Sequence, residues 1–135
     1  MSQENVELVR RACEAWERGE LEIWLATLHP EVVWDSSHFA GWEEGAIYRG
    51  RSQVRAFLVD DWRASWQRYD ALVEEVADVG DRVLVLWWQR MVDPAGGTPL
   101  EVRSAQVCSV RDGLICRMDN YTDRAEALKA VGLSE

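Results

Sequence analysis

Apolar residues recur at the spacing of an amphipathic helix near the start of the chain. The first stripe follows Ser2, a favourable helix cap, ends before Gly19, and consists of Val6, Val9, Cys13 and Trp16. A second stripe consists of Leu21, Trp24, Leu25 and Leu28. Pro30 disfavours helical angles at the residue before it, which predicts the end of this second helix. The pattern therefore predicts two short helices.

A short strand, a loop and a third helix are predicted next. Residues 31–35 are rich in strand-forming side chains, whereas residues 36–50 are polar and contain glycine. A third helix is predicted over residues 52–66, because one face of it would carry Val54, Phe57, Leu58, Trp62 and Trp66.

The remainder of the chain alternates strand-forming runs with turn residues. The runs cover residues 70–79, 82–92, 100–110 and 114–121, and the glycine-containing segments between them are typical of hairpin turns. Asp123 and Glu126 indicate the start of a last helix, which Gly132 ends. The order ααβαββββα predicts one α+β domain over residues 1–135, with helices on one face of a curved antiparallel sheet.

Trp87 and Trp88 are adjacent in one predicted strand, so their side chains point to opposite faces of the sheet. If the helices cover one face, the tryptophan on the other is exposed, covered by a terminal segment, or buried by a second subunit. We interpret this as a sign of a homodimer formed through the sheet face.

Composition narrows the range of partners. The chain has 15 Lys and Arg against 24 Asp and Glu, a formal net charge of −9, which disfavours nucleic acid and anionic membranes as partners. It contains no apolar run of the length that spans a bilayer, and its first residues do not resemble a secretory signal. The three cysteines lack metal-ligand or disulfide spacing. We expect a soluble cytoplasmic protein with an unusually aromatic interior, since eight residues are tryptophan.

Several separated segments resemble one family. They are MSQENVELVRR at residues 1–11, WERGEL at 16–21, LHPEV at 28–32, YRGRS at 48–52, VRDGLI at 110–115 and YTDRAEAL at 121–128. Together they are similar to the SnoaL-like branch of the nuclear transport factor two-like superfamily. The resemblance implies a cone-shaped fold, in which a curved sheet wraps around helices and leaves a cavity. It also implies one of several functions, among them steroid isomerase, polyketide cyclase, dehydratase and non-catalytic binding domain.

The resemblance makes Asp35 the first candidate for catalysis, because ketosteroid isomerases carry their base at the end of the matching strand. A carboxylate at the rim of an apolar cavity has a raised pKa and is a better base. The alternative is a strand-end aspartate that forms a turn with Ser36 or Ser37. The oxyanion-donor positions of those isomerases match Ala12 and lie near Gln106, so ordinary steroid isomerase activity is not expected.

Three further residues are candidates to orient a substrate or stabilise charge. They are Gln106, Asn120 and His38, of which His38 is alternatively an exposed loop residue. We expect no metal and no cofactor, because two isolated histidines lack ligand spacing and no glycine-rich phosphate loop is present.

The turn between the last two strands leaves two registers open. A two-residue turn pairs Val110 with Ile115, and a three-residue turn with a bulge pairs Val110 with Leu114. We favour the second, because it turns the position that resembles the isomerase acid toward the cavity. The side chains that would then share a face are Gln106, Cys108, Cys116, Met118 and Asn120.

Large aromatic side chains are suitable walls for a flat apolar ligand. The candidate ligand-binding residues are Trp34, Trp42, Phe57, Trp62, Trp66, Trp88 and Met118. The alternative is that most of the tryptophans simply fill the core.

The sequence therefore supports three hypotheses. In the first, a small hydrophobic molecule binds in an aromatic cavity and is converted by a cofactor-independent isomerase, cyclase or dehydratase with Asp35 as the base. In the second, the cavity binds such a molecule without catalysis. In the third, the domain is a dimerisation module with a filled core.

Overall fold

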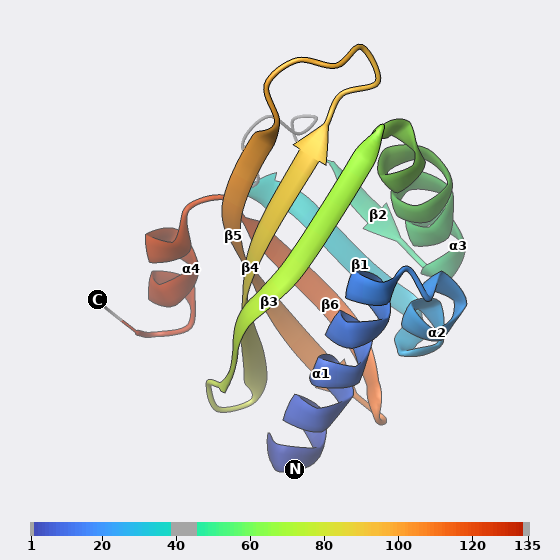
Figure 1. Cartoon of the computed structure of the whole chain (residues 1–135). Helices are drawn as coiled ribbons and strands as arrows, with labels where there is room; N and C mark the ends of the chain where they lie inside the picture. Colours follow the sequence, from blue (N-terminus) through green and yellow to red (C-terminus); the bar gives the residue numbers. More distant parts are fainter. Residues whose placement is uncertain (1, 39–45, 134–135) are drawn as a thin grey trace.

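A computed structural model describes residues 2–38 and 46–133 of the chain. The helices α1 (Ser2–Arg18), α2 (Leu21–Ala26) and α3 (Arg51–Val54) lie on one side of a six-stranded sheet, and α4 (Arg124–Ala130) lies on the other (Figure 1). The strands are β1 (Leu28–His38), β2 (Ile47–Arg49), β3 (Arg68–Asp78), β4 (Arg82–Val92), β5 (Leu100–Arg111) and β6 (Leu114–Tyr121). The predicted α+β class with helices on a curved sheet is confirmed. The expectation that all helices cover one face of a wholly antiparallel sheet is wrong, because α4 packs on the other face and β1 pairs parallel with β6.

The N-terminal region differs from the prediction at the second helix. Helix α1 ends before Gly19, whose φ of 73° is the left-handed conformation that glycine adopts readily. Helix α2 ends at Ala26, and β1 begins at Leu28, two residues before the proline that was expected to end the helix. Leu28 is fully buried and pairs with Ile115 of β6, so tertiary pairing rather than helical periodicity decides its conformation.

Two features of the segment before β3 were not predicted. Strand β2 was assigned to a loop, but it pairs antiparallel with β1 through Val33, Trp34 and Asp35. The third helix covers the expected region in three parts: α3, the π-helical turn η1 (Arg55–Trp62) and the short 3₁₀ turn η2 (Arg63–Ser65). A π-helical turn is wider than an α-helix and is frequently found at functional sites.

The strands follow the order β2-β1-β6-β5-β4-β3. The predicted antiparallel meander of the last four strands is confirmed, and β1 adds parallel to β6. Strand β3 contains a bulge between Val73 and Glu75, and the carboxylate of Glu17 on α1 accepts a hydrogen bond from the Val73 backbone N–H at 2.7 Å. The bulge bends the sheet next to the helix that it surrounds.

The β5–β6 hairpin combines the two registers that the sequence left open. Its turn is the two-residue form, with Asp112 and Gly113 at φ of 56° and 74°, so Val110 pairs with Ile115 and the favoured three-residue turn is wrong. A bulge then leaves Cys116 without a partner, and Cys108 pairs with Met118 rather than standing opposite Cys116.

The bulge restores the predicted side for the residues beyond it. Gln106 and Asn120 face the helices as expected, while Arg103 and Ala105 do not. Cys13 and Cys108 are buried, Cys116 is half-buried, and all three are free thiols. Burial raises the pKa of the Cys108 thiol to about 12, so it behaves as an apolar core residue.

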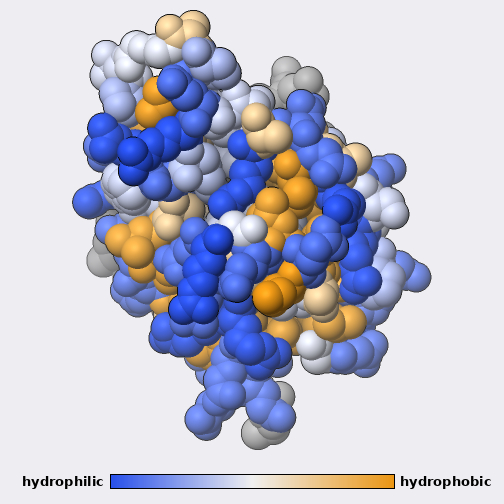
Figure 2. Space-filling model, turned by 45° about the vertical axis from the view of Figure 1, so that its right-hand side comes forward, coloured by the Kyte–Doolittle hydropathy of each residue, from blue (hydrophilic) through white to orange (hydrophobic). Residues whose placement is uncertain are grey.

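The sheet has a core on each face. The larger one lies under α1, α2 and η1, and the smaller one lies under α4, around Leu84, Val107, Tyr121 and Ala127. The sheet face that α1 and α2 cover therefore holds the main core. On the side that carries α2 and α3, hydrophobic residues reach the surface in a band between hydrophilic ones (Figure 2).

Candidate functional site

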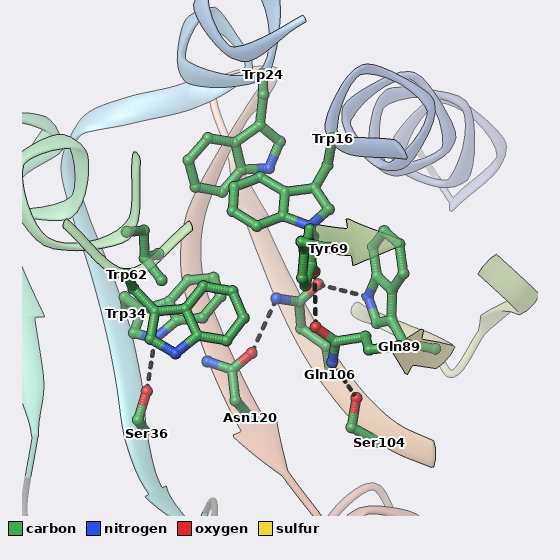
Figure 3. A pocket seen from close by; sticks show the side chains of 12 residues that line it. Trp16, Trp24, Trp34, Ser36, Trp62, Tyr69, Gln89, Ser104, Gln106 and Asn120 are labelled. Carbon is green, nitrogen blue, oxygen red and sulfur yellow. Dashed lines mark hydrogen bonds between the residues drawn. The ribbon is translucent and has the colours of Figure 1, made fainter. Parts of the chain in front are cut away.

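A pocket of about 50 Å³ lies between the helices and the inner face of the sheet (Figure 3). Helical segments contribute Trp16, Trp24, Leu58 and Trp62. The strands contribute Trp34, Ser36, Tyr69, Trp87, Gln89, Ser104, Gln106 and Asn120. These described lining side chains are aromatic, aliphatic or neutral and polar.

Aromatic rings pack against one another along one wall of the pocket. The ring centroids of Trp16 and Trp24 are 4.7 Å apart, and Trp24 makes an edge contact with Trp34 at 6.4 Å. Tyr69 makes edge contacts with Trp16 at 6.0 Å and with Trp62 at 5.3 Å. Such edge-to-face contacts hold rings in fixed orientations, so this wall is rigid and apolar.

A guanidinium group lies over two of these rings. The Cζ atom of Arg63 is 4.5 Å from the Trp16 ring centroid and 4.8 Å from that of Tyr69. Burial lowers the pKa of Arg63, which nevertheless keeps its charge at neutral pH. Arg63 is not a lining residue, and it stabilises the aromatic wall by cation–π contact.

A chain of hydrogen bonds crosses the pocket from α1 to β5. The indole N–H of Trp16 donates to the Tyr69 hydroxyl at 2.8 Å, which donates to the Gln89 carbonyl oxygen at 2.7 Å. The Gln89 amide N–H then donates to the Ser104 hydroxyl oxygen at 3.0 Å. Burial raises the pKa of Tyr69, so this hydroxyl keeps its proton at neutral pH.

A second chain runs beside the first. The indole N–H of Trp87 donates to Gln106 Oε1 at 3.4 Å, and Gln106 Nε2 donates to Asn120 Oδ1 at 2.9 Å. Asn120 Nδ2 donates to the backbone carbonyl of Asp35 at 3.0 Å. Gln106 and Asn120, which the sequence analysis selected to orient a substrate or stabilise charge, thus both line the pocket and are joined directly by a hydrogen bond.

Asp35 itself lies on the opposite face of the sheet from the pocket. Trp34 and Ser36 point inward, so the side chain between them points outward, where Asp35 Oδ2 binds Arg117 Nη2 at 2.8 Å. Burial alone would raise the pKa of Asp35, but hydrogen bonds from Ser37 and the charges of Arg117 and His38 outweigh it and lower the pKa. The prediction of a carboxylate at the cavity with a raised pKa is therefore wrong, and the turn with Ser37 is present.

Other candidates also lie outside the pocket lining. His38 is exposed and stacks on Tyr121 with centroids 4.8 Å apart. Phe57 stacks on Tyr48 at 4.2 Å, and Trp66 makes an edge contact with Trp62 from outside the pocket. Both positions depart from the regular α-helix that was predicted, because Phe57 lies in the π-helical turn and Trp66 follows η2 in an extended conformation.

The remaining candidates divide between the core, the outer face and the undescribed part of the chain. Met118 is buried and touches Gln106 Nε2 through its sulfur at 3.6 Å, without lining the pocket. Trp88 is on the outer face, where its indole N–H donates to Glu101, and Trp87 lines the pocket instead. Of the predicted ligand-binding residues, Trp34 and Trp62 do line it. Trp42 lies outside the described residues.

Strand alternation was a signal for several lining residues that the sequence reasoning missed. Ser36 is two residues from Trp34, Gln89 is two from Trp87, and Ser104 is two from Gln106, so each shares a face with its neighbour. Trp16 and Trp24 were expected in the core, which is correct, but their rings also form the pocket wall.

Two searches of the described residues were negative. They contain no group of three or more His, Cys, Asp or Glu side chains arranged to hold a metal ion. None of the helices in the described ranges has the length and apolar character needed to cross a bilayer.

Comparison with known families settles the classification. A family model described as a SnoaL-like domain matches residues 9–118, which is most of the chain. The chain belongs to the SnoaL-like family. No protein of curated function matches it.

Several solved structures share the fold. An NTF2-like protein of unknown function from Burkholderia pseudomallei is 23% identical with a TM-score of 0.76, covering 95% of this chain and 97% of its own. A putative polyketide cyclase from Xanthomonas campestris is 25% identical with a TM-score of 0.72, at 96% and 98% coverage. A Mycobacterium tuberculosis protein, solved in complex with estradiol-17beta-hemisuccinate, is 22% identical with a TM-score of 0.72, at 87% and 92% coverage.

Proposed function

We propose that this SnoaL-like domain binds a small, uncharged, largely apolar molecule in the tryptophan-lined pocket. The observation that carries the proposal is the neutral lining of that pocket, with the Asp35 carboxylate on the other face of the sheet. A charged ligand would lose its hydration there without meeting an opposite charge among the described lining residues. The M. tuberculosis relative was solved with estradiol-17beta-hemisuccinate, an apolar steroid that carries one carboxylate, which supports the binding of an apolar ring system. The neutral charge proposed for the ligand of this chain is argued from its pocket lining alone.

A binding role fits the geometry better than acid–base catalysis at Asp35. A general base must lie within hydrogen-bond reach of the proton that it removes and have a pKa near the working pH. The Asp35 carboxylate points away from the pocket, and its pKa is lowered. The second of the three sequence-based hypotheses, binding without catalysis, is therefore the one that we propose.

The size of the pocket limits the ligand. A volume of about 50 Å³ is a third of the roughly 150 Å³ that accommodates benzene in an engineered cavity. A ring-sized ligand therefore requires one lining side chain to move. We propose Trp62, because it is only half-buried and belongs to the π-helical turn rather than to the sheet.

Indole N–H signals in a ¹⁵N–¹H correlation spectrum test the proposal directly. On titration with 1-indanone, a small aromatic ketone, we expect the signals of Trp16, Trp24 and Trp87 to shift, because these rings line the pocket. The signal of Trp88 is the internal control, since its side chain is on the outer face. Single Trp→Phe variants assign the signals.

Two results would contradict the proposed pocket. One is the absence of any shift with 1-indanone and with the hydrocarbon indane at millimolar concentration. The other is an equal shift of Trp88 and the lining indoles, which would indicate non-specific adsorption. A saturable shift confined to the lining indoles would support the proposal.

We also propose that the outer sheet face forms a homodimer. Leu72 is 56% exposed and pairs directly with Trp88, and α4 covers only the other part of this face. Charges of both signs surround them, because Arg90 lies opposite Glu101 and Arg103 is 3.9 Å from Glu74. A surface with an apolar centre and both charges at its rim is self-complementary, which favours a second copy of the chain.

Replacing Trp88 with glutamate is expected to convert the dimer into a monomer, because it places a charge at the centre of the apolar contact. Light scattering after size exclusion should give a mass of two chains for the wild type and of one for W88E. Glu31→Gln, an exposed change on another strand, is the control and should leave the mass unchanged. A monomeric wild type at 100 μM, or a dimeric W88E, would refute the proposed interface.

A further inference from the structure

The polar side of the pocket is built from hydrogen-bond chains that each begin at an indole. An indole N–H donates and has no acceptor atom, so it fixes the direction of every hydrogen bond that follows it. Three hydrogen-bonded runs begin in this way, at Trp16, Trp34 and Trp87, and they end differently. The run from Trp34 is a single bond to the Ser36 hydroxyl oxygen at 2.5 Å. The ends of these runs show which donors are left to meet a ligand.

The run of hydrogen bonds from Trp16 has one direction throughout. The Tyr69 hydroxyl oxygen accepts from Trp16, and its single proton is donated to Gln89 Oε1. Gln89 therefore turns its NH₂ group toward Ser104, and the Ser104 oxygen accepts. The Ser104 hydroxyl proton is then left over, and among the described residues it is donated to no acceptor.

The chain from Trp87 leaves no donor over. Gln106 accepts from Trp87, and its two amide protons go to Asn120 Oδ1 and, more weakly, to the Met118 sulfur. Asn120 uses its own amide protons on the backbone carbonyls of Asp35 and Met118. This chain ends on backbone acceptors and is complete without a ligand.

Ser104 is thus a donor without an acceptor among the described residues, and Ser36, which accepts from Trp34 and is 2% exposed, is another. Ser104 differs from Ser36 because an amide group lies beside it. Ser104 is only 3% exposed and lines the pocket, so bulk water does not readily serve it. Gln89 retains a second amide proton beside it, since one of its two is used on Ser104. A buried donor without an acceptor loses its hydrogen bonds to water without replacement, and a ligand oxygen placed here would remove that cost.

We infer that Ser104, supported by Gln89, is a specificity-determining donor of this pocket, and that the ligand presents to it an uncharged acceptor such as a carbonyl or ether oxygen. This inference rests on the proposed binding function. It goes further because it selects acceptor-bearing ligands over hydrocarbons of the same shape. An uncharged oxygen suits this position because Ser104, Gln89 and Tyr69 are neutral, while the Arg63 guanidinium lies on the Trp16 and Tyr69 rings and does not line the pocket.

The test compares two probes of nearly equal shape, 1-indanone and indane, which differ by one carbonyl group. The measured quantity is the ratio of their dissociation constants, obtained from the same indole titrations. We expect the wild type to prefer 1-indanone about fivefold, the size of one net hydrogen bond. Ser104→Ala should reduce the ratio to about one while leaving the affinity for indane nearly unchanged.

A matched control and a distant variant make the test specific. Ser109→Ala removes the same group from the same strand, but on the outer face opposite Arg117, and should keep the wild-type ratio. Trp16→Phe keeps a ring but removes the indole N–H. Without the Trp16 donor, the Tyr69 hydroxyl no longer has to donate to Gln89, so the directions of the hydrogen bonds along the chain are no longer fixed. This variant should therefore lower the ratio of the two dissociation constants although Ser104 itself is unchanged.

The outcomes separate this inference from the proposed function. If neither probe shifts the lining indoles, the proposed function fails. If both bind the wild type equally, or if Ser104→Ala keeps the preference for 1-indanone, the pocket binds ligands but Ser104 does not select them. A preference that Ser104→Ala removes and Ser109→Ala keeps would support the inference.

Discussion

Replacing Trp16 with alanine is expected to lower the free energy of unfolding by about 3–5 kcal/mol, the range for large aromatic residues truncated in a core. Trp16 is 6% exposed and touches Trp24, Tyr69 and the guanidinium of Arg63. It also donates the hydrogen bond that starts the chain across the pocket. Domains of this size are stable by only about 5–15 kcal/mol, so the variant should be close to unfolding.

Urea denaturation followed by far-ultraviolet circular dichroism measures this change in the free energy of unfolding. In a separate thermal unfolding experiment, the melting temperature should fall by more than about 10 °C. Trp16→Phe is the control, because it keeps an aromatic ring in the core and loses mainly the N–H. Trp16→Phe should lower the free energy of unfolding by less than half as much as Trp16→Ala does. Equal losses for the two variants would show that the hydrogen bond, rather than ring packing, dominates at this position.

Replacing Asp35 with asparagine is expected to cost about 1–3 kcal/mol of stability at neutral pH and to leave ligand affinity unchanged. The Asp35 side chain is 10% exposed and is bound by Arg117 and by both the hydroxyl and the backbone N–H of Ser37. Because Arg117 is 42% exposed, solvent screens part of this interaction, which places the expected cost below that of a fully buried pair. A catalytic or ligand-binding role would instead give little loss of stability and a large loss of function.

The same pair makes this contribution dependent on pH. The pKa of Asp35 is lower in the folded state than its ordinary value of 3.8. The unfolded state therefore binds the proton more readily, and the stabilisation is complete above pH 3.8 and is lost as the pH falls through the folded-state pKa. The stability difference between the wild type and D35N should thus be constant from pH 7 to pH 5 and shrink in more acidic solution.

Asp70→Asn is the matched control for both measurements. Asp70 forms an ion pair with Arg68 at the same 2.8 Å distance, but its side chain is 42% exposed, and such surface pairs contribute little. We expect its effect to stay within about 0.5 kcal/mol at every pH. If D35N behaves like D70N, the outer cluster around Arg117 does not stabilise the fold.

The fold could be predicted well wherever local patterns and tertiary contacts agree. Strands β4 and β6 begin and end where the runs of strand-forming residues do, and Gly19 ends the first helix as expected. Strand β2 could not be predicted, because three residues are too few to show the alternation of apolar and polar side chains that identifies a strand. The start of β1 at Leu28 was missed for a related reason, since its pairing with β6 depends on residues almost 90 positions away.

The candidate site was predicted in part, and the main error has a simple physical cause. Adjacent strand residues face opposite sides, which correctly separated Trp87 from Trp88, but placing Trp34 and Asp35 in one cavity violated the same rule. The resemblance to ketosteroid isomerases favoured Asp35, whereas alternation favours Trp34 and Ser36. Hydrogen-bond partners such as Gln89 and Ser104 come from different strands, so their meeting depends on register.

The bulge at Cys116 has a consequence for how the sequence can change. The two-residue turn at Asp112 and Gly113 sets a register that, if continued without a bulge, would point Met118 and Asn120 to the outer face of the sheet. One extra residue in β6 shifts the register and points both side chains toward the helices. Losing the bulge while keeping that residue would force either the turn to open or Arg117 to enter the core. Deleting the residue would instead leave a regular hairpin with the same pairs, so homologous sequences without the bulge should have one residue fewer between the turn and Met118.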